Sequence, residues 1–358
     1  MNPQPQHKAV NLLVVMTDRH IGNLLVSLYA IKAVQEQLSG QQTICCVIDY
    51  HLLSLANYFL PDIDFIPYNV RGTRLSPWKK LKLFIRMVFE IRKRKIDTAV
   101  DLYGHGESFS IARLSGARFI SAFYSRPKLK KKYHWCDVDS SLQAKHQVDY
   151  YLYPFYPLFG LLQAATLNAP KLAATMTSTQ NKLQALTIAG DKPLVVIHPG
   201  AGKEYKLWPS EHWQQLIAKL EDDHYQVLLI GAGIDKSEID GIVSNRSISP
   251  MNGFEQFNLI ETIHLGFISK YMIGNDSGPT HLMATTPSPV ASLFGPTDHT
   301  LWSPLSSNSQ ILRSGTACLN DCSKQICARE ISCLQALSAE DVYTSIFNQK
   351  QHHTESAQ

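Results

Sequence analysis

The chain has 358 residues, 44% of them hydrophobic, and a formal net charge of +4 at neutral pH. This length predicts two domains, and this hydrophobic content is enough to build two cores. No apolar run reaches the roughly eighteen residues that a transmembrane helix needs, and the start of the chain, MNPQPQHKAV, lacks the apolar centre of a signal peptide. We therefore expect a cytoplasmic protein.

Short apolar segments alternate with helical segments along both halves of the chain. In the first half we predict buried strands at Leu12–Met16, Thr43–Ile48, Phe65–Ile66, Ala99–Leu102 and Phe119–Ala122. Helices are predicted between them, for example at Leu24–Leu38 and Pro77–Lys95. In the second half we predict strands at Leu194–Ile197, Gln226–Ile230, Phe267–Ile273 and Val290–Phe294. This alternation predicts an α/β fold with two doubly wound, parallel, Rossmann-like sheets.

A polar, weakly periodic stretch from about Leu167 to Lys192 is predicted to link the two domains. We place the N-terminal domain at residues 1–170, the C-terminal domain at residues 171–348 and a loose polar tail at residues 349–358. Ser338 and Asp341 have the spacing of a capping pair, so they are predicted to begin the last helix.

Positive charge is concentrated in the first domain. Between Arg71 and Lys132 there are 17 lysines or arginines and four acids, a net charge of +13, so the remaining residues carry −9. Some of these cations lie on the predicted helix that begins at Pro77, where the helix dipole alone also favours cations near the end. Others form a patch followed by aromatic residues: Arg126, Lys128, Lys130, Lys131 and Lys132. No nucleic-acid-binding module is visible, and an anionic glycolipid in a membrane explains basic residues beside aromatic ones better.

The segment 272–296, MIGNDSGPTHLMATTPSPVASLFGP, carries the strongest functional signal. Asp276, Ser277 and Gly278 directly follow an apolar run, and His281 comes one helical turn later. This is the layout of a ligand site at the carboxyl end of a parallel strand, where a helix N-terminus offers N–H groups to phosphate. The alternative is a strand-to-helix turn in which Asp276 or Ser277 only caps the helix and His281 only fills the core.

A second segment, 194–220, has a strand, a loop of small residues (His198–Gly202) and an amphipathic helix that begins at Ser210. Glycines in such a loop let backbone amides approach an anion, and Lys203 and Lys206 are close enough in sequence to neutralise it. A later pair of glycines, Gly231 and Gly233, begins a dinucleotide-binding pattern, but Lys236 stands where the third glycine is required, which argues against a Rossmann dehydrogenase.

The seven cysteines do not predict a metal site. Cys45, Cys46 and Cys136 have the surroundings of core or incidental thiols. The other four match no zinc-binding spacing and are predicted to pack a loop, with a metal site or a labile disulfide as alternatives. These four are Cys318, Cys322, Cys327 and Cys333.

The segments HPGAGKEYKLWPSEHW and NDSGPTHLMATTPSPVASLFGPTD, in this order and about eighty residues apart, resemble glycosyltransferase family 9, the ADP-heptose:lipopolysaccharide heptosyltransferases. The similarity extends to VVMTDRHIGNLLVSLYAIKAVQEQL near the amino terminus and to CLNDCSKQICAREISCLQALSAEDVY near the carboxyl terminus. It therefore spans about Asn11 to Ile346.

The resemblance implies a GT-B architecture, in which two Rossmann-like domains face each other across a cleft. It implies an inverting transfer, most simply of heptose from ADP-heptose to the lipid A inner core, without a metal or other cofactor and without nucleic acid as a partner. The N-terminal domain would bind the acceptor at the inner face of the cytoplasmic membrane, and the C-terminal domain would bind the nucleotide sugar. The residues that match the family's donor site are Lys206, Asp276, Ser277, Gly278 and His281, with Lys203 as a further diphosphate ligand and Asp235 as a weaker match near the ribose.

One position departs from the family. The aspartate of the family's Ile-Gly-Asp loop is the expected general base, but this chain has Asn23, and an amide has no useful basicity near neutral pH. Asp18 and His20 are the nearest candidates for a relocated base, and Asp101 and His105 are further ones. The alternatives are a noncatalytic protein that binds nucleotide sugar or glycolipid, and a nucleotide-sugar epimerase with the same two-domain architecture.

Overall fold

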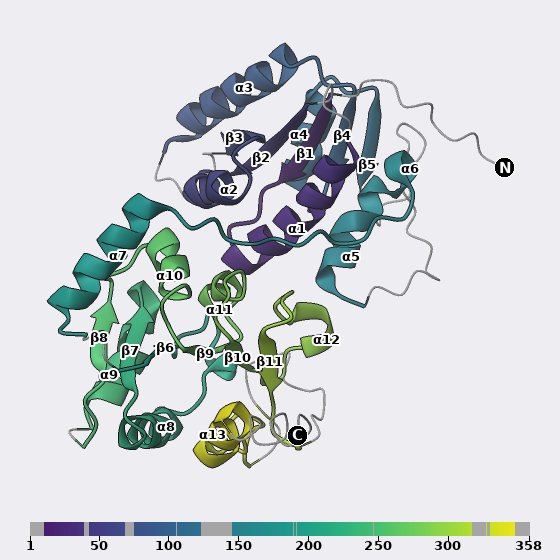
Figure 1. Ribbon diagram of the computed structural model, residues 1–358. Coiled ribbons are helices and arrows are strands. Elements are labelled where there is room, and N and C mark those ends of the chain that lie inside the picture. Colours follow the sequence, from purple (N-terminus) through teal and green to yellow (C-terminus); the bar gives the residue numbers. More distant parts are fainter. Residues whose placement is uncertain are drawn as a thin grey trace, which may run out of the picture. The chain divides into compact units, whose positions relative to one another are not determined.

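The computed structural model describes residues 11–38, 43–68, 75–104, 106–122, 145–188, 190, 192–245, 247–316, 327 and 330–347. The chain divides into two compact units, Met1–Asn168 and Ala169–Gln358 (Figure 1). Within the described residues, no helix combines the length and the apolar character needed to cross a bilayer.

The first unit contains a five-stranded parallel sheet with the strand order β3-β2-β1-β4-β5. Its strands are β1 (Leu12–Met16), β2 (Ile44–Asp49), β3 (Asp64–Tyr68), β4 (Thr98–Asp101) and β5 (Phe119–Ala122). Every residue of the central strand β1, with the sequence LLVVM, is buried. Unbroken apolar runs of this kind are typical of parallel strands that helices cover on both faces, and each predicted strand of this unit is confirmed.

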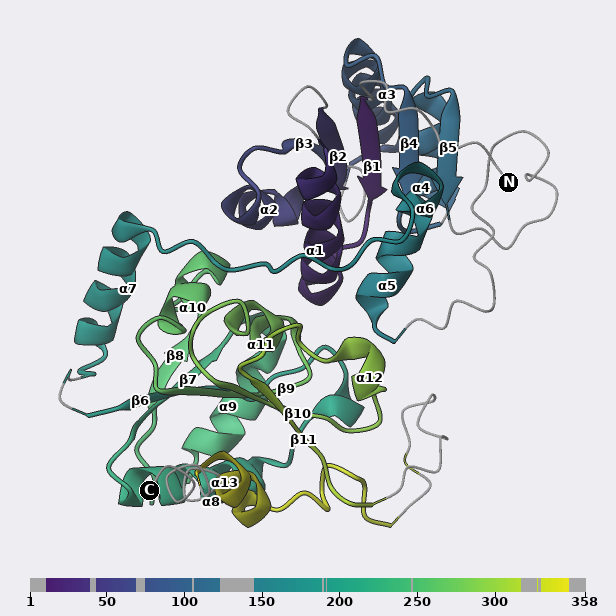
Figure 2. The same ribbon diagram turned by 45° about the vertical axis from the view of Figure 1, so that its right-hand side comes forward.

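Helices cover both faces of this sheet (Figure 2). They are α1 (Ile21–Gln37), α2 (Leu53–Phe59), α3 (Pro77–Lys93), α4 (Gly106–Leu114), α5 (Gln147–Leu152) and α6 (Tyr156–Phe159), with 3-10 turns at Tyr50–Leu52 and Tyr153–Phe155. Met87 and Ile91 of α3 and Ile111 of α4 pack on the face that carries Leu13 and Val15. Helix α1 covers the other face and contacts α5.

The second unit contains a six-stranded parallel sheet with the order β11-β10-β9-β6-β7-β8. Its strands are β6 (Leu194–His198), β7 (Gln226–Gly231), β8 (Met251–Phe254), β9 (Tyr271–Asn275), β10 (Val290–Leu293) and β11 (Ser309–Leu312). The sequence did not predict β8 or β11. The strand predicted at Phe267–Ile273 begins only at Tyr271, because Phe267 and Ile268 still donate backbone hydrogen bonds to the end of the preceding helix.

Two apolar clusters lie on the two faces of this sheet. Val195 and Ile197 of β6 pack with Trp208 and Trp213, whose rings meet edge to face with centroids 4.7 Å apart. Residues of the opposite face, such as Val196, pack with helices on the other side. The helices are α7 (Ala173–Ala185), α8 (Ser210–Asp222), α9 (Lys236–Val243), α10 (Leu259–Leu265), α11 (Gly278–Met283), α12 (His299–Trp302) and α13 (Ala339–Phe347), with 3-10 turns η4 (Glu204–Lys206) and η5 (Gly233–Asp235).

The predicted starting points of two helices are confirmed. Helix α8 begins at Ser210, as its pattern predicted. Ahead of α13, the Ser338 hydroxyl donates to Asp341 Oδ2 at 2.6 Å and accepts from the Asp341 amide, which is the predicted capping pair.

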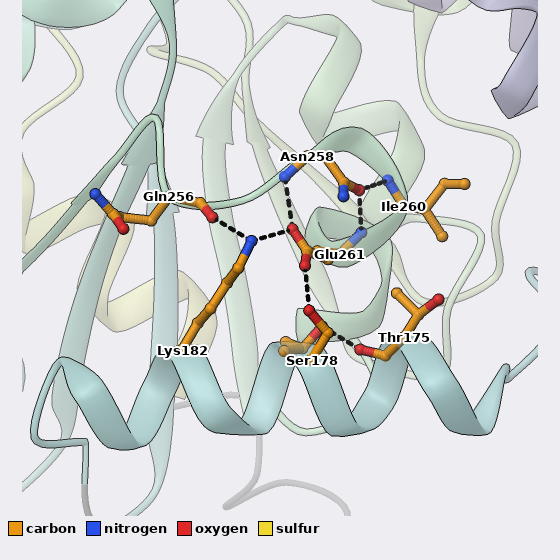
Figure 3. Close-up of polar contacts among 8 residues, drawn as sticks. Thr175, Ser178, Lys182, Gln256, Asn258, Ile260 and Glu261 are labelled. Atoms are coloured by element: carbon orange, nitrogen blue, oxygen red, sulfur yellow. Dashed lines mark hydrogen bonds and ion pairs between the residues drawn. The ribbon is translucent and has the colours of Figure 1, made fainter.

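The predicted linker at 167–192 is wrong in one respect, because half of it forms helix α7 of the second unit. Few apolar residues of α7 are buried, which is why its pattern looked like a linker: Met176 and Leu183 are the apolar ones. Polar contacts hold the helix instead (Figure 3). Ser178 Oγ and Lys182 Nζ both donate to the carboxylate of Glu261 on α10, at 2.6 and 2.7 Å.

Glu261 connects α7 to the first turn of α10. Its side chain is 4% exposed and also accepts the Asn258 amide at 2.9 Å, while Asn258 Oδ1 accepts the amides of Ile260 and Glu261 in return (Figure 3). Burial alone raises the pKa of Glu261, but these hydrogen bonds outweigh it and hold the pKa below its ordinary value. The ionised form therefore stabilises the folded state.

We expect Glu261→Gln to lower the free energy of unfolding by about 1.5–3 kcal/mol at pH 7, the usual range for a hydrogen-bonded charge. The contribution of Glu261 is complete above the ordinary pKa of an unfolded glutamate, about 4.3, and is lost as the pH falls through the lower folded value. Urea unfolding at pH 7 and at pH 3.5 measures this, and the gap between wild type and variant should narrow at pH 3.5. The exposed Glu211→Gln is the control, and an equal loss in both variants would contradict the assignment.

Candidate active site

The second sheet changes its winding direction between β6 and β9. The chain runs from β6 outward to β7 and β8, then returns beside β6 with β9 and continues to β10 and β11. Loops after the two adjacent strands therefore diverge, and ligands of doubly wound folds bind at this place. His198 ends β6 and Asn275 ends β9, so both predicted motifs meet there.

An ion pair joins the two motifs. Lys206 Nζ, on the 3-10 turn after β6, lies 2.7 Å from Asp276 Oδ2 after β9. The side chains of Lys206 and Asp276 are 22% and 5% exposed, and His281 Nε2 on α11 lies 4.0 Å from the other carboxylate oxygen of Asp276. The structure thus brings three of the predicted donor-site residues together.

The side chains of Asp276 and Ser277 do not act as a simple helix cap. Ser277 occupies the N-cap position of α11, but its side chain caps no amide. Its hydroxyl lies 3.1 Å from His198 Nδ1 and 3.0 Å from Thr280 Oγ1. Asn275 Nδ2 donates to the Pro199 carbonyl at 2.6 Å, so β9 and the loop after β6 are joined a second time.

Asp235 braces the loop after β6 from the side of β7. Its Oδ2 lies 3.4 Å from His198 Nε2 and accepts the Ala232 amide at 3.0 Å. Burial raises the pKa of Asp235, but the contact with His198 and the amide hydrogen bond outweigh it and lower the pKa. A Cβ on Gly200 would stand 1.9 Å from Asp235 Oδ1, so the glycine is required by this close approach. Lys203 is exposed, and Gly278 is the half-buried first residue of α11.

The first sheet changes direction between β1 and β4, where Asp18 follows β1 and Asp101 ends β4, both of them buried. Asp101 accepts the amides of Tyr103 and Gly104 and the hydroxyl of Ser108, each at 3.0 Å. Its carboxylate is therefore committed to its own loop and is no candidate base. His105, the other candidate after β4, lies outside the described residues.

The loop after β1 holds the remaining candidates. Asp18 is 4% exposed, and its Oδ1 accepts the His20 amide at 2.6 Å and lies 2.7 Å from His20 Nδ1. Asn23 Nδ2 donates to Asp18 Oδ2 at 2.8 Å. Burial raises the pKa of Asp18, but the hydrogen bonds from His20 and Asn23 outweigh it and lower the pKa. The His20 side chain is 82% exposed.

These two sites lie on a chain whose sequence matches one known family. A family model described as glycosyltransferase family 9 (heptosyltransferase) matches residues 84–331, more than half of the chain. The chain belongs to this family. It is therefore a glycosyltransferase.

Relatives within glycosyltransferase family 9 include lipopolysaccharide heptosyltransferase 3 of Escherichia coli, which is 26% identical over 266 residues, 69% of this chain and 73% of the relative. Lipooligosaccharide heptosyltransferase 2 of Haemophilus influenzae is 30% identical over 151 residues, 39% of this chain and 42% of the relative.

Two solved structures show that the chain has the GT-B type of fold. The ADP-heptose lipopolysaccharide heptosyltransferase II of E. coli superposes with a TM-score of 0.74 at 18% identity, over 96% of this chain and 99% of that one. The family 9 glycosyltransferase of Veillonella parvula superposes with a TM-score of 0.83 at 16% identity, over 98% and 100%.

Some of the residues predicted from the sequence of this family 9 chain lie outside the described residues, and the sequence did not predict some residues of the site. The basic patch Arg126, Lys128, Lys130, Lys131 and Lys132 lies outside the described residues, as do Cys136, Cys318 and Cys322. Cys45 and Cys46 are core residues, as predicted. The sequence did not single out Thr280 or the role of His198, because their contacts with Ser277 depend on how the two loops fold together. The spacing Ser-x-x-Thr after β9 was the available signal.

We expect Gly200→Ala to destabilise the second unit by about 1–3 kcal/mol, because the new methyl group must displace Asp235 from His198 and from the Ala232 amide. The matched control is Gly202→Ala, where nothing lies within 4 Å of the added methyl and the change should stay within about 0.5 kcal/mol. Thermal and urea unfolding measure both. Equal stability of the two variants would show that Asp235 does not hold this loop.

Proposed function

We propose that the protein transfers heptose from ADP-heptose to the inner core of lipopolysaccharide or a related glycolipid, with inversion at the anomeric carbon. The observation that carries the proposal is the Lys206–Asp276–His281 group at the direction change of the second sheet in a family 9 chain. The names of the relatives, lipopolysaccharide and lipooligosaccharide heptosyltransferases, support the choice of sugar and acceptor.

Lys206 is suited to the diphosphate of the donor. An ammonium group has three N–H donors, and the contact with Asp276 uses one of them. Lys206 can therefore hold a phosphate oxygen while it stays bonded to Asp276. Lys203 and the backbone around Ser277 and Gly278 add further donors for the leaving group, whose negative charge grows as the bond to the sugar breaks.

Asp276 is suited to the sugar of the donor. A carboxylate is an acceptor with two oxygens, and one oxygen of Asp276 stays available for sugar hydroxyls beside Lys206. Because sugar hydroxyls are neutral and phosphate is anionic, an acid next to a lysine distinguishes the two parts of the donor by charge. His281 and Ser277 complete the polar wall, and Asp235 supports the loop behind it.

A donor screen tests the proposal. Purified protein is incubated with ADP-, UDP-, GDP- or CMP-sugars and heptose-deficient lipopolysaccharide, and release of the nucleotide is measured. We expect release from ADP-heptose only when the acceptor is present. Release from another donor would overturn the assignment of the sugar, conversion of the donor without acceptor would indicate an epimerase, and binding without release would indicate a noncatalytic protein.

With the active donor, we expect Lys206→Ala and Asp276→Asn each to lower kcat/KM about 100-fold or more, because one lost stabilising group at a developing charge costs about 3 kcal/mol. Lys236→Ala is the matched control, since it removes a Lys–Asp pair that is exposed on α9. Unchanged melting temperatures exclude misfolding. Near wild-type turnover in both site variants would remove this group from the mechanism.

We further propose that helix α3 contacts an anionic membrane surface that presents the acceptor. Opposite its buried residues Met87 and Ile91, α3 exposes an apolar stripe comprising Trp78 (80% exposed), Leu81 (47%), Ile85 (58%) and Phe89 (60%). Its exposed cations are Lys79, Lys82, Arg86, Arg92 and Lys93, and no acid lies in its first turn. A basic helix with exposed tryptophan and phenylalanine is typical of segments that lie in the lipid headgroup region.

We expect Trp78→Ser/Phe89→Ser to weaken binding to vesicles of phosphatidylglycerol and phosphatidylethanolamine more than tenfold, since each buried aromatic side chain contributes about 1.5–3 kcal/mol. Lys82→Gln/Arg86→Gln should weaken binding mainly at low salt, because salt screens the charges. Leu161→Ser, which removes another exposed apolar side chain (70%), is the control. Vesicle binding that none of these changes alters would place the membrane contact elsewhere.

A further inference from the structure

We propose that His20 is the general base of the transfer and accepts the proton of the acceptor hydroxyl on Nε2, while Asp18 and Asn23 act as positioning residues that hold its ring. The inference rests on the proposed function and names the group that replaces the aspartate expected at position 23. Three side chains after β1 support it. Asp18 is buried, the exposed ring of His20 is hydrogen-bonded to it, and the side-chain amide of Asn23 is hydrogen-bonded to the same carboxylate.

The geometry determines which nitrogen of His20 carries the proton. Asp18 is ionised near neutral pH, since its pKa lies below the ordinary value, and an ionised carboxylate only accepts hydrogen bonds. His20 Nδ1, 2.7 Å from Asp18 Oδ1, must therefore carry a hydrogen and donate it. In the neutral ring Nε2 then has a free electron pair, which is the form that a general base needs.

Exposure distinguishes His20 from Asp18 as the base. The Asp18 side chain is 4% exposed and its two oxygens receive the His20 amide, the His20 ring and the Asn23 amide. The His20 side chain is 82% exposed, and its contact with Asp18 is made through Nδ1 rather than Nε2. Both oxygens of Asp18 already accept hydrogen bonds, whereas the exposed ring of His20 is open to a substrate hydroxyl.

The same contact explains why position 23 is an asparagine. Asn23 Nδ2 lies 2.8 Å from Asp18 Oδ2 and donates to it. An aspartate at position 23 would place two carboxylates at hydrogen-bonding distance. Their repulsion would raise the free energy of the state in which both are ionised. The Asn23 main chain is also fixed, because Ser27 Oγ donates to its carbonyl at 2.7 Å in the first turns of α1.

In the reaction, the acceptor O–H bond breaks and its proton moves to His20 Nε2. The acceptor oxygen uses the freed electron pair to form a bond with the anomeric carbon. The bond from that carbon to the diphosphate breaks, and its electron pair leaves with the nucleoside diphosphate. The imidazolium that remains is stabilised by Asp18 at 2.7 Å and returns its proton to solvent.

Among the described residues, Arg19 and Tyr151 are charged or titratable groups near this loop, and neither replaces His20 as the partner of Asp18. Arg19 points to the buried Asp49, with Nε 3.6 Å from Oδ2, so it does not compete with His20 for Asp18. Tyr151 on α5 interacts electrostatically with Asp18, and burial raises the pKa of Tyr151, so that it stays neutral.

With the donor and acceptor that the wild type uses, we expect His20→Gln to lower kcat 100-fold or more while the KM for the donor stays within about threefold. Because the side chain is exposed, the substitution removes no packing, and ADP affinity should match the wild type. The exposed His224→Gln, next to the amino end of β7, is the control.

The positioning residues have their own readout. Added imidazole should restore part of the kcat of His20→Ala, but much less in His20→Ala/Asp18→Asn, because the added ring loses the partner that orients it. Asn23→Asp should lower kcat. The inference is overturned if His20→Gln keeps more than about a third of wild-type kcat, or if Asn23→Asp raises kcat sharply. Failure of the proposed function looks different, because it shows in the wild type itself, which would then use another donor, convert ADP-heptose without an acceptor, or release no nucleotide at all.

Discussion

In a parallel sheet that helices cover on both faces, polar side chains can reach a ligand only at the ends of the strands. This constraint determines where the polar sites lie in both units of the protein. The strands contribute the apolar cores, as in β1 and β6, where every residue is buried. The chemistry is gathered where each strand ends: Asp18 after β1, His198 after β6 and Asp276 after β9. In each sheet, the place where the winding changes direction brings two such ends together.

The buried carboxylates of these ends fall into two kinds. The carboxylate oxygens of Asp101 and Asp235 bind backbone amides or neighbouring side chains and so fix the conformation of loops. Asp18 and Asp276 instead hold a side chain that is itself more exposed, His20 in one unit and Lys206 in the other. The buried acid fixes the position of the group, and the more exposed partner offers it to a ligand. Glu261 is a purely structural counterpart, since it joins two helices.

The sequence predicted most of the fold because most of the strands are unbroken apolar runs. It failed where that signal is weak: β8 has the sequence MNGF and β11 has SQIL, and both are short and half exposed. Helix α7 was missed because polar contacts with α10, some eighty residues further on, hold it in place. The motifs placed Lys206, Asp276 and His281 in one site. The sequence singled out Asp235 but could not predict its contact with His198, because that contact depends on how the segments after β6 and β7 fold together.

The hydrogen bond between Asn23 and Asp18 has a consequence for how activity is inferred across glycosyltransferase family 9. An alignment column that asks only whether position 23 is acidic would classify this chain as a degenerate homologue. In this chain the hydrogen-bonded pair Asp18 and Asn23 carries a single negative charge, and an acid at position 23 would place a second charge beside the first. Such a pair cannot be exchanged one residue at a time without passing through a sequence that carries two charges or none. With His20 as the proposed base, a change at any one of positions 18, 20 and 23 alters what the other two can do.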